Sequence, residues 1–501
     1  MMHFVKRHWL IITILALALF VRLYRIEATM TFLEDEGRDL LVVKRMFDTG
    51  KPALLGPQTS TGNMYLGPAY YYFIAPALVL SGMNPLGPAI LIAFSGLATV
   101  YFLYYLGKQW FGARTGYSAA ILYALMPLPV AFTRNSWNPN LAPLVSLLIV
   151  WVVIRIMQKT GSYVKNYLAL GALLGILVQL HYMTLLLVVA VGLSLIMYKW
   201  QDWQKLAIGS LLALAAATLS MAPFIVFEVR NNFVNTRAIT RFVEAKEEHN
   251  IRYALPFGLW RDKVVASGTR LFASQFGRDA LTPDPHRVMI AVVVSALLIW
   301  GVVKNRHDKK YRAVAILFLI PFALLGIYQE NVHLHYLGFL FPLTYLLVAA
   351  APASWLLSLA LMVYAVPQTV SYLGSGDTHQ LVRAEEVAAY ISANAGDIPY
   401  NVTSAEGSPA APYLYYLALA SHPPTTEHVT KLFLICQGEL CASEDINSPF
   451  IYITGPAHPT LELYLGHPLY NYFEGSRKIV LQEHVSHGTF VTMLEIEGPP
   501  Q

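Results

Sequence analysis

The chain has 501 residues, of which 56% are hydrophobic and only 13% are charged. A soluble globular chain carries about 25% charged residues, so this composition excludes a soluble enzyme with a single apolar segment. The formal net charge is +5, and the Lys and Arg residues gather in short stretches between apolar segments. This distribution indicates loops retained on the cytoplasmic side of a membrane, and it makes nucleic acid a poor candidate partner.

The first apolar segment covers residues 9–21 and follows Lys6 and Arg7. No small-residue cleavage site follows it. We expect an uncleaved first transmembrane helix whose start lies in the cytoplasm.

The orientation of all later segments depends on residues 65–80. If this apolar stretch crosses the membrane, every later short basic loop lies outside, against the positive-inside rule. The stretch is also interrupted by Pro68 and Pro76, and its consecutive tyrosines are typical of a membrane interface. We therefore expect residues 27–86 to form one outer loop with two membrane-surface helices, the first at about 36–47.

The remaining spans then alternate across the membrane, with the N-terminus inside and the C-terminus outside. We expect them near residues 88–107, 117–132, 141–157, 167–180, 183–198, 206–227, 288–303, 313–328, 337–350 and 355–373. The fold class is thus a polytopic α-helical membrane protein with about eleven transmembrane helices. A second long outer loop covers residues 228–286.

The character of the sequence changes after residue 373, where apolar runs shorten and Gly, Ser and Asp appear. We expect a transmembrane domain over residues 1–373 and a small α/β extracytoplasmic domain over 374–501. The pattern predicts a helix at 383–393 and strands at 400–403, 431–436, 450–454, 479–482 and 490–494. Cys436 and Cys441 fit no zinc pattern, and an outer location permits a disulfide between them.

The first outer loop contains three consecutive acids, Glu34, Asp35 and Glu36. Their mutual repulsion is expected to raise the pKa of at least one carboxyl, which suits a proton acceptor. The alternative is structural, because acids in the first turn of a helix interact favourably with its dipole.

Polar residues at later outer turns are candidates for substrate contacts. Arg134 could pair with phosphate or with the acids of the first outer loop, and Asn138 could bind a sugar or cap the following helix. His181 interrupts a long apolar run, so it faces a cavity or forms a helix turn.

The long outer loop over residues 228–286 contains Arg230 near its start and is rich in arginine, which suits a phosphate ester; a solvated helix face is the alternative. In the next outer turn, His335 and Tyr336 are candidates for phosphate or sugar contacts. His333 and His335 alone are a weak metal signal, so no cofactor is assigned and a divalent metal stays an open alternative.

Several stretches together resemble glycosyltransferase family 39, the protein O-mannosyltransferase and aminoarabinose transferase group of GT-C membrane enzymes. The likeness covers about residues 9–345. It rests on the Asp35-Glu36 pair after the first helix, and on the stretches 47–50, 104–112, 134–139 and 222–233.

The resemblance implies a GT-C-like fold with an active site at the outer membrane face. It implies that Asp35 is the catalytic base and that Glu36 assists it. The family often has an acid in the outer loop at residues 133–140, where this sequence has Asn138. A basic residue usually precedes the tyrosine of the later outer turn, and here His335 precedes Tyr336.

These expectations combine into a membrane glycosyltransferase that moves a sugar, with inversion, from a polyprenyl-phosphate carrier to an acceptor hydroxyl. Arg230 and Arg134 would stabilise the departing phosphate. The expected partners are the lipid-linked donor, a lipid, glycan or protein acceptor, and the cell membrane itself. Alternatives are a transporter or flippase of lipid-linked sugars, an oligosaccharide-transferring or glycan-polymerising enzyme of the same fold class, and a non-catalytic scaffold.

Overall fold

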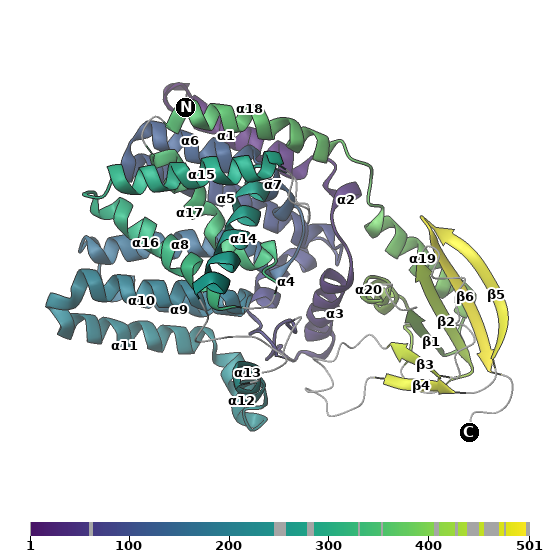
Figure 1. Cartoon of the computed structure of the whole chain (residues 1–501). Helices are drawn as coiled ribbons and strands as arrows, with labels where there is room; N and C mark the ends of the chain where they lie inside the picture. The colour runs from purple at the N-terminus through teal and green to yellow at the C-terminus, as the bar shows by residue number, and fades with distance from the viewer. Residues whose placement is uncertain are drawn as a thin grey trace. The chain divides into compact units, whose positions relative to one another are not determined.

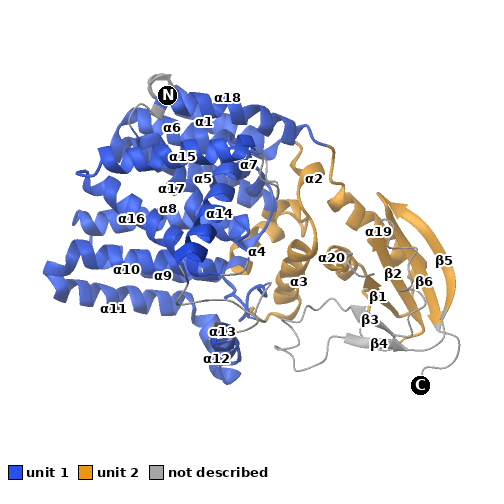
Figure 2. Ribbon diagram, viewed as in Figure 1, with its two compact units in different colours: residues 1–24, 54–70, 89–375 blue, residues 25–53, 71–88, 376–501 orange. Residues whose placement is uncertain are grey.

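The structure is a computed structural model that describes residues 2–59, 64–244, 257–277, 285–328, 331–351, 354–404, 410–425, 429–437, 450–454, 470–474 and 477–496. The chain folds into two compact units (Figure 2). Unit 1 comprises residues 1–24, 54–70 and 89–375, and unit 2 comprises residues 25–53, 71–88 and 376–501. Unit 2 therefore combines the C-terminal segment with two parts of the segment predicted to form the first outer loop.

Unit 1 is helical (Figure 1). Its α-helices are α1 (Met2–Leu23), α5 (Leu86–Phe111), α6 (Ala113–Leu125), α7 (Pro127–Phe132), α8 (Ala142–Met157), α9 (Tyr163–Leu180), α10 (Leu185–Lys199), α11 (Trp203–Ser220), α12 (Ala222–Arg230), α13 (Val234–Glu244), α14 (Phe257–Phe276), α15 (Pro285–Lys304), α16 (Lys309–Leu324), α17 (Phe341–Ala350) and α18 (Ser354–Leu373). Short 3-10 turns are η1 (Asn138–Leu141), η2 (Tyr182–Thr184), η3 (Trp200–Asp202), η4 (Leu325–Ile327) and η5 (Leu334–Leu340).

Each apolar segment predicted to span the membrane is helical. Within the described residues, seven helical segments are long and apolar enough to cross a bilayer, and three apolar helices are shorter. The polytopic helical fold is therefore confirmed, whereas the count of eleven is not. Two predicted spans are broken at Met126 and Met221, which are not helical, and the new helices that follow have Pro127 and Pro223 in their first turn.

The second predicted surface helix is α4 (Ala69–Leu80), which has 12 residues. At 1.5 Å per residue it is about 18 Å long, well short of the roughly 30 Å hydrocarbon core. Its length therefore agrees with the expectation that it does not cross the membrane.

Glycines allow α9 to pack closely on α11. A Cβ atom on Gly171 would lie 1.8 Å from the Ala213 carbonyl oxygen, and one on Gly175 would lie 2.1 Å from the Ser220 hydroxyl oxygen. Small residues at such contacts let transmembrane helices approach until their backbones touch. The sequence of α9 therefore determines which of its faces meets α11.

Two buried arginines close helix ends inside unit 1. Arg22, at the end of α1, donates from Nη1 to the Ala124 carbonyl at 3.0 Å and from Nη2 to the Tyr123 carbonyl at 3.1 Å. These carbonyls belong to the last turn of α6, where a positive charge also interacts favourably with the helix dipole. Arg134 does the same for α1, as described below.

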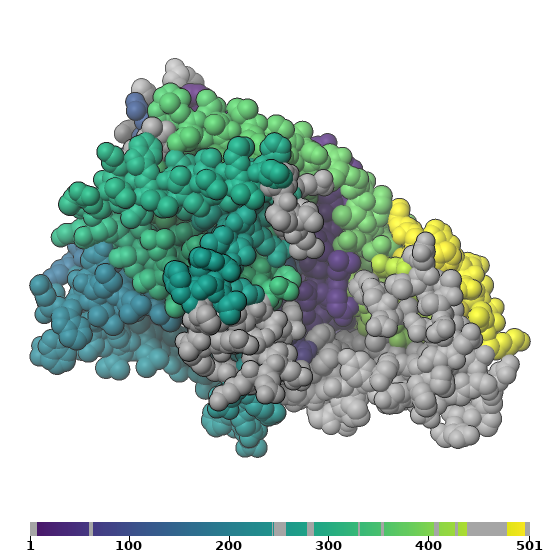
Figure 3. Space-filling view, viewed as in Figure 1, coloured from purple at the N-terminus to yellow at the C-terminus, as the bar shows by residue number. Residues whose placement is uncertain are grey.

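Unit 2 contains α2 (Ile26–Thr29), α3 (Glu34–Thr49), most of α4, α19 (Gln380–Ala395), α20 (Ala411–Leu419), β1 (Tyr400–Ser404), β2 (Lys431–Gln437), β3 (Phe450–Thr454), β4 (Tyr470–Glu474), β5 (Arg477–Ser486) and β6 (Thr489–Ile496). One sheet has the order β1-β2-β6-β5, with β1 and β2 parallel and the other neighbours antiparallel, and β3 pairs with β4. β5 is an edge strand whose described side chains are mostly exposed (Figure 3, yellow).

All five predicted strands are present, while β4 and α20 were not predicted. Cys436 lies buried on β2 and is disulfide-bonded. Its predicted partner, Cys441, lies outside the described residues.

Helix α3 is attached to α20 by a close backbone contact. A Cβ atom on Gly37 would lie 2.5 Å from the Ala411 carbonyl carbon, so only glycine fits at this position. This contact orients the first turn of α3, which carries the three consecutive acids.

Candidate active site

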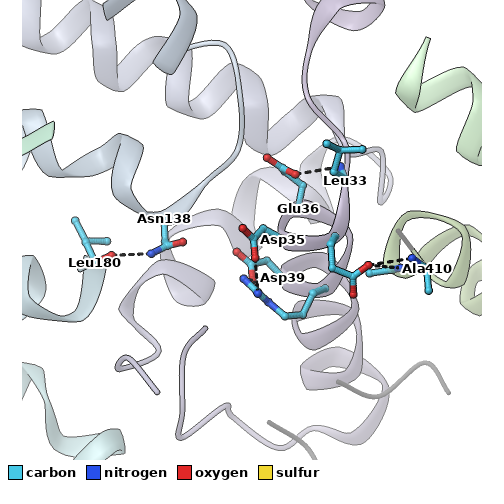
Figure 4. Close-up of polar contacts among 10 residues, drawn as sticks. Leu33, Asp35, Glu36, Asp39, Asn138, Leu180 and Ala410 are labelled. Atoms are coloured by element: carbon cyan, nitrogen blue, oxygen red, sulfur yellow. Dashed lines mark hydrogen bonds and ion pairs between the residues drawn. The ribbon is translucent and has the colours of Figure 1, made fainter. Parts of the chain in front are cut away.

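The three acids at the start of α3 have different partners (Figure 4). Glu34 accepts hydrogen bonds at Oε2 from the backbone N–H groups of Ala410 and Ala411, at 2.9 and 3.1 Å. These N–H groups belong to the first turn of α20, so Glu34 caps that helix. Glu36 accepts at Oε2 from the Leu33 N–H at 3.0 Å and thereby caps α3 itself.

Asp35 is the acid of the three that caps no helix. Its side chain is 42% exposed, and its Oδ1 atom lies 2.5 Å from Nη1 of Arg38, one helical turn later. Arg38 is buried and also donates from Nε and Nη2 to Oδ1 of Asp39, at 3.0 and 2.8 Å. Arg38 therefore joins an accessible carboxylate to a buried one (Figure 4).

Burial alters the acidity of this cluster. The pKa of Glu36 is raised to about 7, first by its burial and to a smaller extent by the charges of Asp35 and Asp39. Burial likewise raises the pKa of Asp39 to about 6, against the lowering effect of Arg38. The sequence predicted a raised pKa from mutual repulsion, but loss of solvation is the larger cause.

Arg134 is 1% exposed and closes the end of α1. Its Nη1 atom donates to the carbonyls of Val21 and Arg22 at 2.7 and 3.1 Å, and its Nη2 atom donates to the Tyr24 carbonyl at 2.8 Å. These contacts are those of a C-terminal helix cap.

Asn138 and His181 lie at the junction between α9 and α10. Asn138 donates from Nδ2 to the Leu180 carbonyl at 2.6 Å (Figure 4). His181 accepts at Nδ1 from the Met183 N–H at 3.2 Å, which supports the turn that separates the two helices. The predicted break of the long apolar run at His181 is confirmed.

His335 and Tyr336 belong to a cluster of aromatic rings formed by η1, η2 and η5. The His335 ring centroid lies 4.3 Å from that of Trp137 and 4.5 Å from that of Tyr336, and the His181 centroid also lies 4.5 Å from Tyr336. Burial lowers the pKa of His181 to about 4. Burial, followed by the neighbouring His181, His333 and Arg270, holds the pKa of His335 well below its usual range.

Both imidazoles in this cluster are therefore neutral near pH 7 and present hydrogen-bonding nitrogens beside flat aromatic faces. Such flat, neutral rings suit a sugar, and Arg270 of α14 is a cation close enough to act on His335. Across the described ranges, no three His, Cys, Asp or Glu side chains are grouped as metal ligands.

Arg230 ends α12 and is exposed. It makes no hydrogen bond or ion pair with another residue that the structure describes. The turn that follows is held by the buried Glu228, whose two oxygens accept from the N–H groups of Asn235 and Thr236 at 3.1 and 2.7 Å. The position of Arg230 is thus supported by a capped helix, while its guanidinium stays available.

Three residues of these clusters were not among the predicted site residues: Arg38, Asp39 and Trp137. A signal for Arg38 was present, because residues three apart on a helix are neighbours and Arg38 follows Asp35 at that spacing. The contact of Trp137 with His335 joins residues that are 198 positions apart, and no local pattern reports it.

Comparison with protein families gives a match between residues 66–227 and the model of the dolichyl-phosphate-mannose-protein mannosyltransferase family. No curated protein sequence matches the chain.

Comparison with solved structures identifies two similar folds. ArnT from Cupriavidus metallidurans bound to undecaprenyl phosphate aligns with a TM-score of 0.62 at 13% identity, over 97% of this chain and 98% of that one. The oligosaccharyltransferase AglB from Archaeoglobus fulgidus, in complex with an inhibitory peptide and a dolichol-phosphate, aligns with a TM-score of 0.53 at 9% identity, over 86% of this chain and 70% of that one. The resemblance inferred from the sequence is therefore confirmed: the chain has the fold of the GT-C membrane glycosyltransferases, and its residues 66–227 match the mannosyltransferase family model.

Proposed function

We propose that the protein is a membrane glycosyltransferase that moves a sugar, with inversion, from a polyprenyl-phosphate carrier to an acceptor hydroxyl on the outer face of the cell membrane. The similar ArnT structure contains undecaprenyl phosphate, and the AglB structure contains a dolichol-phosphate. Both ligands are polyprenyl phosphates, which supports a donor of this chemical class for the present chain.

Asp35 is proposed as the general base. The observation that carries this assignment is that the three acids have different hydrogen-bond partners. Glu34 and Glu36 are bound to helix N–H groups, whereas Asp35 pairs with the Arg38 side chain and is 42% exposed. A carboxylate that must accept a proton from a substrate has to be accessible to it. Glu36 is then a positioning residue, because it fixes the turn that carries Asp35.

In the proposed step, an Asp35 carboxylate oxygen takes the proton of the acceptor hydroxyl while the hydroxyl oxygen attacks the anomeric carbon of the sugar. The bond between that carbon and the phosphate oxygen breaks as the new glycosidic bond forms. The polyprenyl phosphate leaves with the bonding electrons, and a single displacement inverts the anomeric configuration.

The donor phosphate requires a cation, and Arg230 suits this role better than Arg134. The donors of Arg134 are bound to three carbonyls, whereas Arg230 is exposed at a helix end. The neutral rings of Trp137, His335 and Tyr336 are proposed to contact the sugar, and Asn138 and His181 to support their turn.

The test is incubation of the purified full-length protein with a set of polyprenyl-phosphate sugars and hydroxyl acceptors. The wild-type protein is expected to release polyprenyl phosphate and to form a product of inverted anomeric configuration, measured by NMR. Asp35→Asn is expected to lower turnover by about 10²–10⁴-fold, the usual contribution of a general base.

Asp48→Asn is the matched control. Asp48 is on the same helix, is 53% exposed, and also pairs with a cation one turn away, Lys44. It should keep wild-type turnover. Sustained turnover in Asp35→Asn would refute the assigned base, and a product of retained configuration would refute the single displacement.

A further inference from the structure

A cavity of about 350 Å³ lies among α8, α9, α10 and α11, at the ends of these helices that the charge pattern predicts to be cytoplasmic. Its volume is within the range of small-molecule sites. Its lining contains four cationic side chains and one carboxylate: Arg155, Lys159, Lys199, Lys205 and Asp202. None of these residues belongs to the clusters described above.

The cations are held in place by contacts around the cavity. Arg155 donates from Nε to Oδ1 of Asn166 at 3.3 Å, and Lys199 donates from Nζ to the Met157 carbonyl at 3.1 Å. Lys159 pairs with Asp202 at 3.0 Å. The ammonium group of Lys205 has no hydrogen-bond partner among the described residues, so the cavity keeps an excess of positive charge.

Gly161 shapes one wall. Its φ is +73°, and a Cβ atom there would lie 1.9 Å from Nη2 of Arg155. Glycine therefore permits the left-handed backbone conformation and leaves room for the guanidinium beside the loop.

The surroundings indicate where the cavity lies in a membrane. Trp200 lies in the turn between α10 and α11, and Trp203 begins α11. They are 68% and 61% exposed, and exposed tryptophans are enriched at the headgroup level of bilayers. From Ile208, which lines the cavity, an exposed apolar stripe continues along α11 through Leu211 and Leu214. Cations at the headgroup level next to an apolar stripe match the two parts of a phospholipid.

We propose that this cavity binds the phosphate headgroup of an anionic phospholipid of the cytoplasmic leaflet, with its acyl chains along α11. Basic pockets between transmembrane helices on the cytoplasmic side are suited to such headgroups. The site is separate from the proposed transfer reaction and does not depend on it.

The test uses the full-length protein in a neutral detergent, titrated with phosphatidylglycerol, with phosphatidylcholine, or with inorganic phosphate, and measured by native mass spectrometry. We expect one saturable phosphatidylglycerol site that phosphatidylcholine does not fill. The double variant Lys159→Gln/Lys205→Gln should bind phosphatidylglycerol about 25-fold more weakly, because each cation near a headgroup contributes about fivefold.

Two further variants make the result specific. Lys159→Arg/Lys205→Arg should retain binding, because it keeps both charges. Lys304→Gln/Lys309→Gln removes two exposed lysines predicted to be on the same membrane side but outside the cavity, and it should also retain binding. Equal loss in this control, filling by phosphatidylcholine, or displacement of the lipid by inorganic phosphate alone would overturn the proposal.

Discussion

The guanidinium of Arg38 holds the carboxylate of its neighbour Asp39, with Nε and Nη2 at 3.0 and 2.8 Å from the same oxygen, Oδ1. Both side chains are almost fully buried, at 5% and 1% exposure. A buried ion pair is weak evidence for stability by itself, but loss of one partner is costly. The pair therefore fixes the guanidinium that contacts the exposed Asp35.

Replacing Arg38 tests whether it positions Asp35. Arg38→Met leaves the Asp39 carboxylate buried without its cation, so unfolding should become easier by about 3–5 kcal/mol. The double variant Arg38→Met/Asp39→Leu removes both charges and should recover most of the thermal stability while turnover stays low. Recovery of both properties would show that Arg38 is purely structural. Lys44→Met, which breaks the exposed pair with Asp48, should cost less than about 1 kcal/mol.

Glu36 predicts a specific pH dependence of stability. The folded protein raises its pKa from 4.5 to about 7, so the folded state holds this proton more tightly than the unfolded chain does. The resulting stability is present below about pH 4.5 and is lost as the pH rises through 7. Glu36→Gln should remove this loss and be more stable at pH 8, by on the order of 1–3 kcal/mol. Thermal unfolding in detergent from pH 4.5 to 8 measures this difference in stability. If stability changed with pH in the same way in both proteins, the raised pKa of Glu36 would be contradicted.

Arg134 is expected to act on stability. Arg134→Met removes the donors to three carbonyls at the end of α1, so the free energy of unfolding should fall by about 3–5 kcal/mol. Arg134→Lys should recover little, because an ammonium group lacks the fork that reaches all three. Normal thermal stability together with weak donor binding would instead identify Arg134 as a phosphate ligand.

Arg230 is expected to show the opposite behaviour. Arg230→Gln should change the free energy of unfolding by less than about 0.5 kcal/mol, because the side chain is exposed. The KM for the donor should rise at least about tenfold, since a hydrogen bond to a charged group contributes about 1.5–3 kcal/mol. Arg241→Gln, in the next helix and also exposed, is the control and should leave the KM unchanged.

Much of the fold could be predicted from local pattern. The first helix, the break at His181 and the strand β3 all follow from runs of apolar or β-favouring residues and from the residues that interrupt them. Helix α20 was missed because its nine residues are apolar without a clear period, and β4 because Asn471 and Glu474 interrupt its aromatic residues. Pro127 and Pro223 indicate helix breaks, but the apolar character of residues 117–132 and 206–227 led to the prediction of unbroken spans.

The sequence by itself determined that the chain is a polytopic membrane protein, because transfer of an apolar segment into lipid depends on that segment alone. The sequence also showed three consecutive acids, but it could not predict which of them cap helices and which one stays accessible. Tertiary structure decided that, since the N–H groups capped by Glu34 lie 376 residues away along the chain. The same holds for Arg134, whose three acceptors become neighbours only when α1 packs against the turn after α7.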